Sequence, residues 1–181
     1  SRALQATWSG SIGTPLIQAD LRGGAGQLEG TLTNVSPRKL KSPMLFYLDK
    51  AFLIEQDLEP GATVALDPTR TRLLQGALGE ISARFDRYYS VESVDQALNE
   101  RRPLMNNLMF FDSIEVRNRY LTNGSLRALD LSGHLKLGRP ILVAEIDIPS
   151  ARLDLEPSSE AKFFESSYVR ILLPAPVAPG R

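Results

Sequence analysis

Two short stretches near the start of the chain alternate apolar and polar residues with a period of two. The first, Gly26–Asn34, runs from a strand into a turn, and the second, Leu58–Leu66, runs from a Pro-Gly turn into a strand. Such alternation, bounded by Asn, Pro and Gly, is typical of half-buried antiparallel strands. The pattern therefore predicts a mainly β protein built as a small antiparallel sandwich. The alternating apolar positions are Leu28, Gly30, Leu32, Ala62, Val64 and Leu66.

Length and charge limit the classes of protein to which the chain can belong. Its 181 residues fit one domain, or one domain with a large insertion. Lysine and arginine total 21, and aspartate and glutamate also total 21, so the chain lacks the basic excess of a nucleic-acid-binding protein. The absence of cysteine excludes disulfides, thiolate catalysis and cysteine-based zinc sites. No apolar run approaches the roughly 20 residues that span a bilayer, so we expect any membrane connection to run through a longer parent chain.

Turn signals divide the chain into several expected strands. A hairpin is predicted around Asp49-Lys50, and the apolar run Pro140–Ile148 is the most β-prone segment, so we expect it at the centre of a sheet. The expected strands cover residues 3–8, 14–21, 27–34, 43–48, 51–56 and 61–66, and then residues 126–128, 140–148, 151–155 and 168–173.

The pattern between these two groups of strands changes from alternating to helical. Asp67-Pro68 is a favourable helix start, because aspartate caps helices and proline suits the first helical position. A second short helix is predicted from Ser90 to Pro103, and a helical turn at Asp130–Leu137 closes at Gly138. The expected stripe on the first helix consists of Leu73, Leu74, Ala77, Leu78, Ile81 and Phe85.

The simplest fold that accommodates these elements is an immunoglobulin-like antiparallel β-sandwich. We expect a single domain over residues 1–174, with a partly helical insertion at about residues 67–125 between the fifth and sixth strands. Residues 175–181 are rich in proline and alanine and are expected to form a tail or linker.

Several of these segments carry a resemblance to a known group of proteins. The stretch Gly26–Asn34 and the turn Leu58–Ala62 resemble immunoglobulin-like modules in the extracytoplasmic parts of bacterial envelope proteins. A second block is similar to uncharacterised membrane-associated bacterial proteins that carry such a module late in the chain. The segments of this block are Leu108–Phe111, Asn118–Tyr120, Asp130–Arg139 and Ile141–Val143.

This resemblance implies a fold and a location but no chemistry, because the group has no assigned activity or functional residues. It implies a module on the periplasmic side of a bacterial membrane, as part of a longer membrane-attached protein. The expected partners are other envelope proteins or neighbouring domains of the parent chain.

Candidate catalytic residues are few. His134 is the one histidine, and a Ser-His-Asp triad would have to combine it with Asp130 and Ser132. No Gly-x-Ser-x-Gly turn is present, and a partly exposed histidine on a helical turn is the simpler interpretation. The acidic residues do not follow the spacing of a calcium loop. We therefore predict no catalytic, metal-binding or cofactor-binding residues.

Two clusters in the insertion are candidates for a binding surface. Arg84, Tyr88 and Tyr89 lie close together in sequence, and aromatic residues flanked by arginine are enriched in binding hot spots. Arg117 and Arg119 could hold a carboxylate or another anion, because guanidinium groups bind such ions in a bidentate manner. For the first cluster, the simpler interpretation is that one aromatic ring lies in the core and the others partly cover it. For the second cluster, the simpler interpretation is that the arginines form ion pairs that hold the insertion against the sandwich.

These observations predict a non-enzymatic extracytoplasmic interaction or spacer module of a larger membrane-attached bacterial protein. The alternative is a carbohydrate-binding module that uses Tyr88, Tyr89 or Trp8 to stack on sugars. A hydrolase centred on His134 is the third hypothesis.

Overall fold

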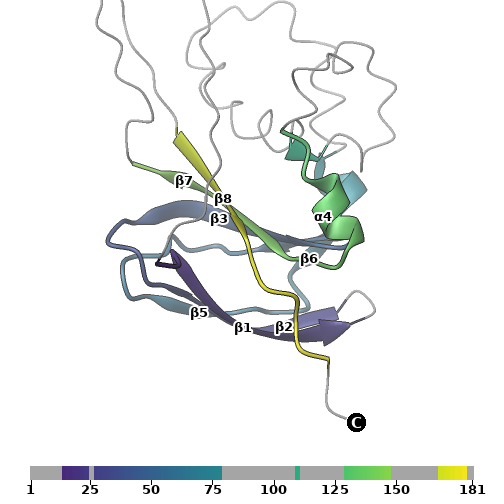
Figure 1. The fold of residues 1–181 in the computed structure, drawn as a ribbon, viewed down its shortest axis with the longest axis horizontal. Coiled ribbons are helices and arrows are strands. Elements are labelled where there is room, and N and C mark those ends of the chain that lie inside the picture. Colours follow the sequence, from purple (N-terminus) through teal and green to yellow (C-terminus); the bar gives the residue numbers. More distant parts are fainter. Residues whose placement is uncertain (1–13, 25–26, 79–108, 111–128, 148–166, 179–181) are drawn as a thin grey trace, which may run out of the picture.

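The computed structural model describes residues 14–24, 27–78, 109–110, 129–147 and 167–178, which form two antiparallel sheets (Figure 1). The smaller sheet has the order β1-β2-β5, and the larger has the order β6-β4-β3-β7-β8. This arrangement confirms the prediction of a mainly β protein with two antiparallel sheets. The strands are β1 (Ile17–Gly24), β2 (Gln27–Asn34), β3 (Leu40–Tyr47), β4 (Lys50–Leu53), β5 (Thr63–Ala65), β6 (Thr71–Leu73), β7 (Ile141–Ile146) and β8 (Ser167–Leu172).

A first apolar cluster fills the space between the two sheets. Leu28 and Leu32 of β2 are buried there, as the period-two pattern predicts, and they belong to the same cluster as Leu45 of β3, Phe52 of β4 and Leu142 of β7. Burial of each such side chain stabilises the fold by roughly 1.5–3 kcal/mol. The alternation in the sequence therefore identifies the residues that hold the two sheets together.

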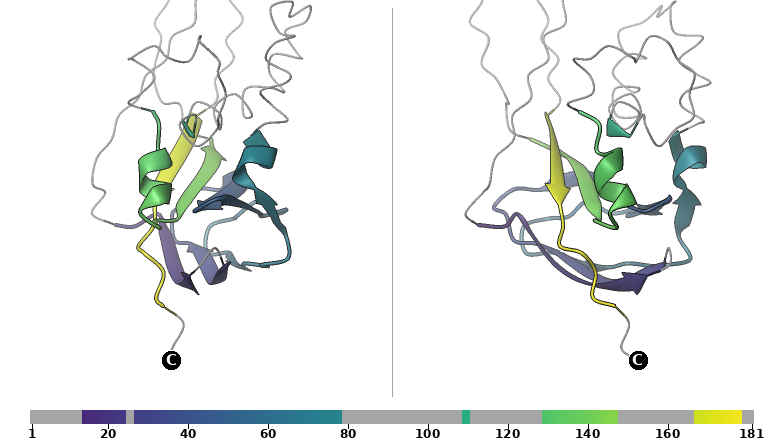
Figure 2. Two further views of the ribbon diagram at one scale, coloured as in Figure 1. Left: turned by 90° about the vertical axis from the view of Figure 1, so that its right-hand side faces the viewer. Right: turned by 45° about the vertical axis from the view of Figure 1, so that its right-hand side comes forward.

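A second apolar cluster covers the opposite face of the five-stranded sheet. Phe46 of β3 and Ile141 of β7 lie on this outer face, and the helical residues 74–78 and the short helix α4 (Ser132–Lys136) pack against them. Figure 2 shows both helical segments on the side of the sheet that faces away from β1 and β2. The described part of the molecule therefore has three layers: a small sheet, a large sheet and a helical layer.

The apolar run that starts at Pro140 contains the strand β7 (Ile141–Ile146), which lies inside the large sheet as predicted. Strand β7 lies between β3 and β8, and Ile141, Leu142, Val143 and Ala144 are all buried. Alternate residues of this run belong to the inner and outer clusters. A strand that is buried on both faces reads as a continuous apolar run rather than as an alternating one.

The prediction that a helix begins at Asp67-Pro68 is wrong. The Asp67 carboxylate accepts hydrogen bonds from the backbone and hydroxyl of Thr69 (2.8 and 2.6 Å), and Arg70 N donates to Asp67 O (3.1 Å), so the chain turns. It then forms β6 against β4, and the helix begins only at Leu74. Asp67 does accept a hydrogen bond from a nearby backbone N–H, as a helix cap would, but here the bond closes an Asx turn that leads into a strand.

Other expected boundaries shift by a few residues or lie outside the described residues. The hairpin between β3 and β4 turns at Leu48-Asp49, one residue earlier than expected, with Leu48 at a φ of 51°. Leu73 belongs to β6 and is 63% exposed, whereas Leu74 and Leu78 are buried as the helical stripe predicts. The expected segments that lie outside the described residues are 3–8, 90–103, 126–128 and 151–155, together with Ile81 and Phe85.

Two features near the end of the chain connect the layers. Gly138 closes α4 at a φ of 68°, the left-handed conformation that was expected there. After β8 the chain crosses to the small sheet, where Val177 N donates to Leu21 O and Gly23 N donates to Val177 O, both at 3.0 Å. Val177, which lies in the expected tail, therefore pairs with β1 in parallel.

Replacement of Gly30 by alanine tests the close pairing of β1 and β2. Gly30 has a φ of 126°, and a Cβ atom there would lie 2.0 Å from the carbonyl oxygen of Asp20 on β1. Since both the backbone conformation and the contact exclude a side chain, we expect Gly30→Ala to lower the free energy of unfolding by at least about 2 kcal/mol. Urea unfolding followed by circular dichroism measures this change.

The matched control is Gly24→Ala in the same pair of strands. A Cβ atom at Gly24 meets no atom within 4 Å, so we expect a change of less than about 0.5 kcal/mol. Equal stability of the two variants would contradict the close approach at Gly30.

Candidate functional site

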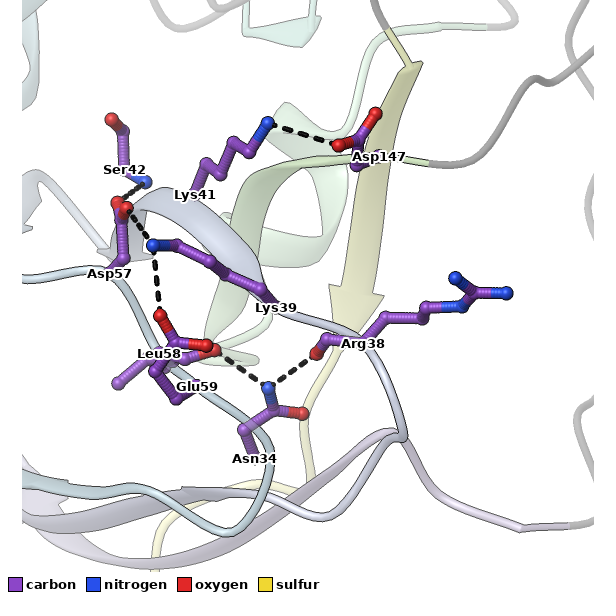
Figure 3. Close-up of polar contacts among 9 residues, drawn as sticks. All are labelled: Asn34, Arg38, Lys39, Lys41, Ser42, Asp57, Leu58, Glu59 and Asp147. Carbon is purple, nitrogen blue, oxygen red and sulfur yellow. Dashed lines mark hydrogen bonds and ion pairs between the residues drawn. The ribbon is translucent and has the colours of Figure 1, made fainter.

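Asn34 joins the two segments that the sequence pattern singles out (Figure 3). Its side-chain Nδ2 donates hydrogen bonds to Leu58 O (2.8 Å) and to Arg38 O (2.7 Å). The backbone adds two more bonds, from Asn34 N to Ala62 O (2.9 Å) and from Gly61 N to Asn34 O (2.7 Å). The end of the first motif therefore binds the turn of the second directly.

All hydrogen-bond donors and acceptors of the Asn34 side chain have partners within the protein. Its Oδ1 accepts hydrogen bonds from the backbone N (3.0 Å) and the hydroxyl (2.7 Å) of Ser36, so both lone pairs and both amide hydrogens have partners. Asn34 is fully buried and Ser36 is 5% exposed. This cluster is a structural joint and not a place where a ligand could bind.

The joint places a group of charged side chains on the surface beside it, which we call the lysine surface: Lys39, Lys41, Asp57, Glu59 and Asp147 (Figure 3). Lys39 Nζ lies 3.0 Å from Asp57 Oδ2 and 2.9 Å from Glu59 Oε1. Lys41 Nζ lies 3.4 Å from Asp147 Oδ2. Two lysines thus face three carboxylates, and the charges largely neutralise one another within the group.

A strained backbone position lies at the centre of the lysine surface. The pairing of β3 with β7 shifts register between Lys41 and Met44, and Ser42 within this bulge has a φ of 45°. Ser42 N donates to Asp57 Oδ1 at 2.8 Å. The bulge turns the N–H of Ser42 toward a carboxylate on another segment, and that bond holds the strained conformation.

The same contacts shift the pKa values of two members of the lysine surface. The backbone N–H of Ser42, followed by the Lys39 ammonium, holds the pKa of the Asp57 carboxyl below its usual value. Hydrogen bonds to Glu59 and Asp57 raise the pKa of Lys39. Because these side chains are more than one-third exposed, solvent screens the pairs and each contributes modestly to stability. The group therefore stabilises a surface and does not concentrate an unbalanced charge.

The three residues of the hypothetical triad occupy one end of α4. Ser132 is fully buried, and its hydroxyl and backbone N both donate to Asp130 Oδ1, at 2.7 and 3.1 Å. Within the described residues no hydrogen bond links the His134 ring to either side chain. Asp130 therefore acts as a local turn acceptor before the helix. The described ranges also contain no group of three or more histidine or acidic residues placed to hold a metal ion.

A shallow cleft of about 280 Å³ opens between the end of β4 and β5. Apolar side chains of Ile54, Val64 and Leu66 line it. Arg70, also in the lining, pairs with Glu55 and with Asp67, whose Oδ2 lies 3.5 Å from its Nε. The guanidinium of Arg70 is thus already engaged by two carboxylates of this chain. This contact was not among the predictions from the sequence, because no local pattern specifies that Arg70 meets Glu55 of the neighbouring segment.

The residues that the sequence predicted for a binding surface lie outside the described residues. They are Arg84, Tyr88, Tyr89, Arg117 and Arg119, and Trp8 lies outside them as well. The described residues nearest to them along the chain, Leu78, Met109 and Phe110, are buried in the outer cluster.

Comparison with protein-family models, with curated proteins and with solved structures finds no significant match to the chain. In the described ranges, no helix has both the length and the apolar character needed to cross a membrane. A function has to be inferred from the geometry of the described residues.

Removal of the Asn34 side chain tests the joint between the two motifs. In Asn34→Ala the backbone N–H of Ser36 loses its acceptor, whereas the carbonyls of Leu58 and Arg38 each keep one donor, Leu40 N and the Ser36 hydroxyl. We expect the free energy of unfolding to fall by about 2–4 kcal/mol, because a buried N–H without a partner costs on the order of 1–3 kcal/mol and each further lost hydrogen bond costs about 1 kcal/mol. Urea unfolding measures the loss.

The adjacent residue provides the control for this variant. Thr33 shares an exposed hydrogen bond between its Oγ1 and Thr63 Oγ1, at 2.8 Å. We expect Thr33→Ala to cost no more than about 1 kcal/mol. A loss in Asn34→Ala no larger than that of the control would show that the joint is not needed for stability.

The lowered pKa of Asp57 predicts a pH-dependent contribution to stability. Because its folded-state pKa lies below the usual value of 3.8, the stabilisation is present above that value and is lost as the pH falls through the folded-state pKa. We expect Asp57→Asn to be less stable than the natural chain near pH 7, by up to about 1 kcal/mol. Thermal unfolding across a pH series should show the two curves converging in acid. Glu29→Gln, at an exposed carboxylate on β2, should leave the stability near pH 7 unchanged within about 0.5 kcal/mol. A constant offset between Asp57→Asn and the natural chain across the pH series would contradict the assignment.

Proposed function

We propose that the chain is a non-enzymatic interaction module of a larger membrane-attached bacterial protein, located on the extracytoplasmic side. The sandwich serves as a rigid base, and the segment between β6 and β7 supplies the surface that meets a protein partner. The partners are other envelope proteins or neighbouring domains of the parent chain. The resemblance of Gly26–Asn34 and of Leu58–Ala62 to envelope modules supports the location.

The observation that carries this proposal is the burial of both ends of that segment on the outer face of the large sheet. Leu74 and Leu78 at its start and Leu135 near its end are 1–3% exposed, and all three belong to the outer cluster. Between them, Phe110 packs against Phe46 of β3 with ring centroids 4.4 Å apart. Leu131 N also donates to Met109 O at 2.6 Å, which ties the middle of the segment to its end.

This anchoring favours a segment that presents a binding surface to a partner over a segment that only links two domains. The described residues of the segment, 74–78, 109–110 and 129–138, are attached to the sheet through the outer cluster. Attachment at several buried points favours a surface for a partner over a connection between two domains, because ordering before binding lowers the entropy cost of association. The interaction module is therefore the function that the geometry supports best.

We also propose that the sandwich is of the immunoglobulin-like type. The assignment is supported by the sheet order, in which β1, β2 and β5 form one sheet while β3, β7 and β8 are neighbours in the other, with β4 on the far side of β3. In this assignment β1, β2 and β5 correspond to strands A, B and E of such domains. Strands β4, β3, β7 and β8 correspond, in that order, to strands C′, C, F and G. The segment between β6 and β7 then occupies the E–F position of the fold.

Substitution of the predicted contact residues in the full-length parent protein tests the interaction function. We expect a variant with alanine at Arg84, Tyr88 and Tyr89 to lose its crosslinked partners about tenfold or more in native membranes, because aromatic and arginine side chains dominate binding hot spots. Mass spectrometry of the crosslinked material measures the loss. The variant should retain cooperative thermal unfolding, since the buried anchors remain in place.

Arg38→Ala is the control, because the Arg38 side chain is exposed and its backbone carbonyl, which Asn34 and Ser36 bind, is retained. The control should keep every partner. Unchanged crosslinking by the triple variant would contradict the use of these three residues. Recovery of the parent protein in the cytoplasmic fraction without partners would contradict the envelope module altogether.

A further inference from the structure

Among the described residues, no strand pairs with the side of β8 that faces away from β7. Leu173 N donates to Pro140 O at 2.9 Å, and the register pairs Ile141 with Leu172 and Val143 with Arg170. In an antiparallel pair, alternate residues point their N–H and C=O groups toward the partner strand and away from it. Since Leu173 faces β7, the backbone groups of Leu172 and Arg170 face away from it, on the open side of the sheet.

The other sheet edges in the described ranges are shorter or already paired. Strands β5 and β6 have three residues each. Strand β1 has eight, but Val177 bonds to its outer side through Leu21 and Gly23. Strand β8 has six residues and contains no proline, glycine or lysine, residues that often mark an edge protected against pairing with another strand.

The side chain of Arg170 adds an unbalanced charge at this edge. Tyr168, Arg170 and Leu172 lie on the outer face of the sheet, since Val169 and Ile171 pack against the inner cluster. The guanidinium of Arg170 is half-buried, its Nη1 donates to Leu129 O at 3.3 Å, and burial lowers its pKa. No carboxylate among the described residues pairs with it. A half-buried guanidinium is stabilised by a carboxylate placed within hydrogen-bonding distance.

We propose that an extended segment of a partner protein adds to the edge of β8 at Arg170 and Leu172, with an acidic residue opposite Arg170. The backbone of the segment pairs with the outward-facing groups of these two residues and extends the large sheet to six strands. Its acidic side chain lies on the outer face and binds the Arg170 guanidinium, while its neighbouring residues face inward beside Val169 and Ile171 and are apolar. This second surface goes beyond the proposed function and does not depend on which partner meets the segment between β6 and β7.

Fluorescence anisotropy with two labelled peptides tests this proposal on the 181-residue chain. The first peptide, Ser-Thr-Val-Glu-Val-Thr-Ser, places a glutamate between inward-facing valines, and the second carries lysine in place of that glutamate. We expect the glutamate peptide to bind at least about tenfold more tightly, as expected for a charge-assisted hydrogen bond that is lost in the lysine peptide. In Arg170→Glu the order of the two peptides should reverse.

Two variants at one position separate backbone pairing from side-chain contacts. Leu172→Pro removes the outward N–H without removing a bond to β7, whereas Leu172→Ala shortens the side chain and keeps that N–H. We expect Leu172→Pro to lose binding and Leu172→Ala to retain it, with cooperative thermal unfolding in both. Equal binding of the two peptides by the natural chain, or equal binding by the two Leu172 variants, would overturn the proposal. Self-association of the chain that Leu172→Pro abolishes would overturn it as well, because a second copy would then occupy the edge.

Discussion

Strands β3 and β7 are buried on both faces, and this burial requires a layer on each side of the large sheet. Leu45 and Leu142 face the small sheet, while Phe46 and Ile141 face the helical layer. A two-layer sandwich would leave the second pair exposed to water at a cost of roughly 1.5–3 kcal/mol for each side chain. The described parts of the segment between β6 and β7 therefore have a structural role, because they cover the outer face of the central strands and complete its packing.

The crossing between the two sheets is held by polar contacts in addition to the buried side chains of Leu40 and Leu58. Where β2 ends and the chain passes toward β3, Asn34 bonds the turn at Leu58 and Gly61, and Asp57 receives the N–H of Ser42 in the bulge of β3. A buried amide with all four of its hydrogen-bonding positions satisfied fixes one geometry, since any displacement leaves a buried group without a partner. These contacts hold the lysine surface in place, where its two lysines pair with its three carboxylates.

The sequence allowed the strands and their inward residues to be predicted where local pattern and burial agree. Strand β2 occupies residues 27–34 as expected, and the apolar run at Ile141–Ile146 is central because a strand covered on both faces contains little polar sequence. The helix start at Asp67 was predicted wrongly, since an aspartate that accepts a bond from a nearby backbone N–H serves a turn as well as a helix. Here the turn forms instead of the helix, because residues 71–73 pair with β4 and the helix begins only at Leu74.

The sequence by itself determined the antiparallel β class, the alternating core positions of β2, the central place of β7 and the two motifs that flank the sheet crossing. Periodicity and turn residues encode these features, because each depends on neighbours a few positions away. Only the tertiary structure decided that Asn34 of the first motif binds the turn of the second and that Val177 pairs with the edge of β1. It also decided that, among the described residues, no strand pairs with the outer edge of β8 and no carboxylate pairs with Arg170. Each of these depends on segments that are distant in sequence, and no local pattern specifies which of them meet when the sheets pack.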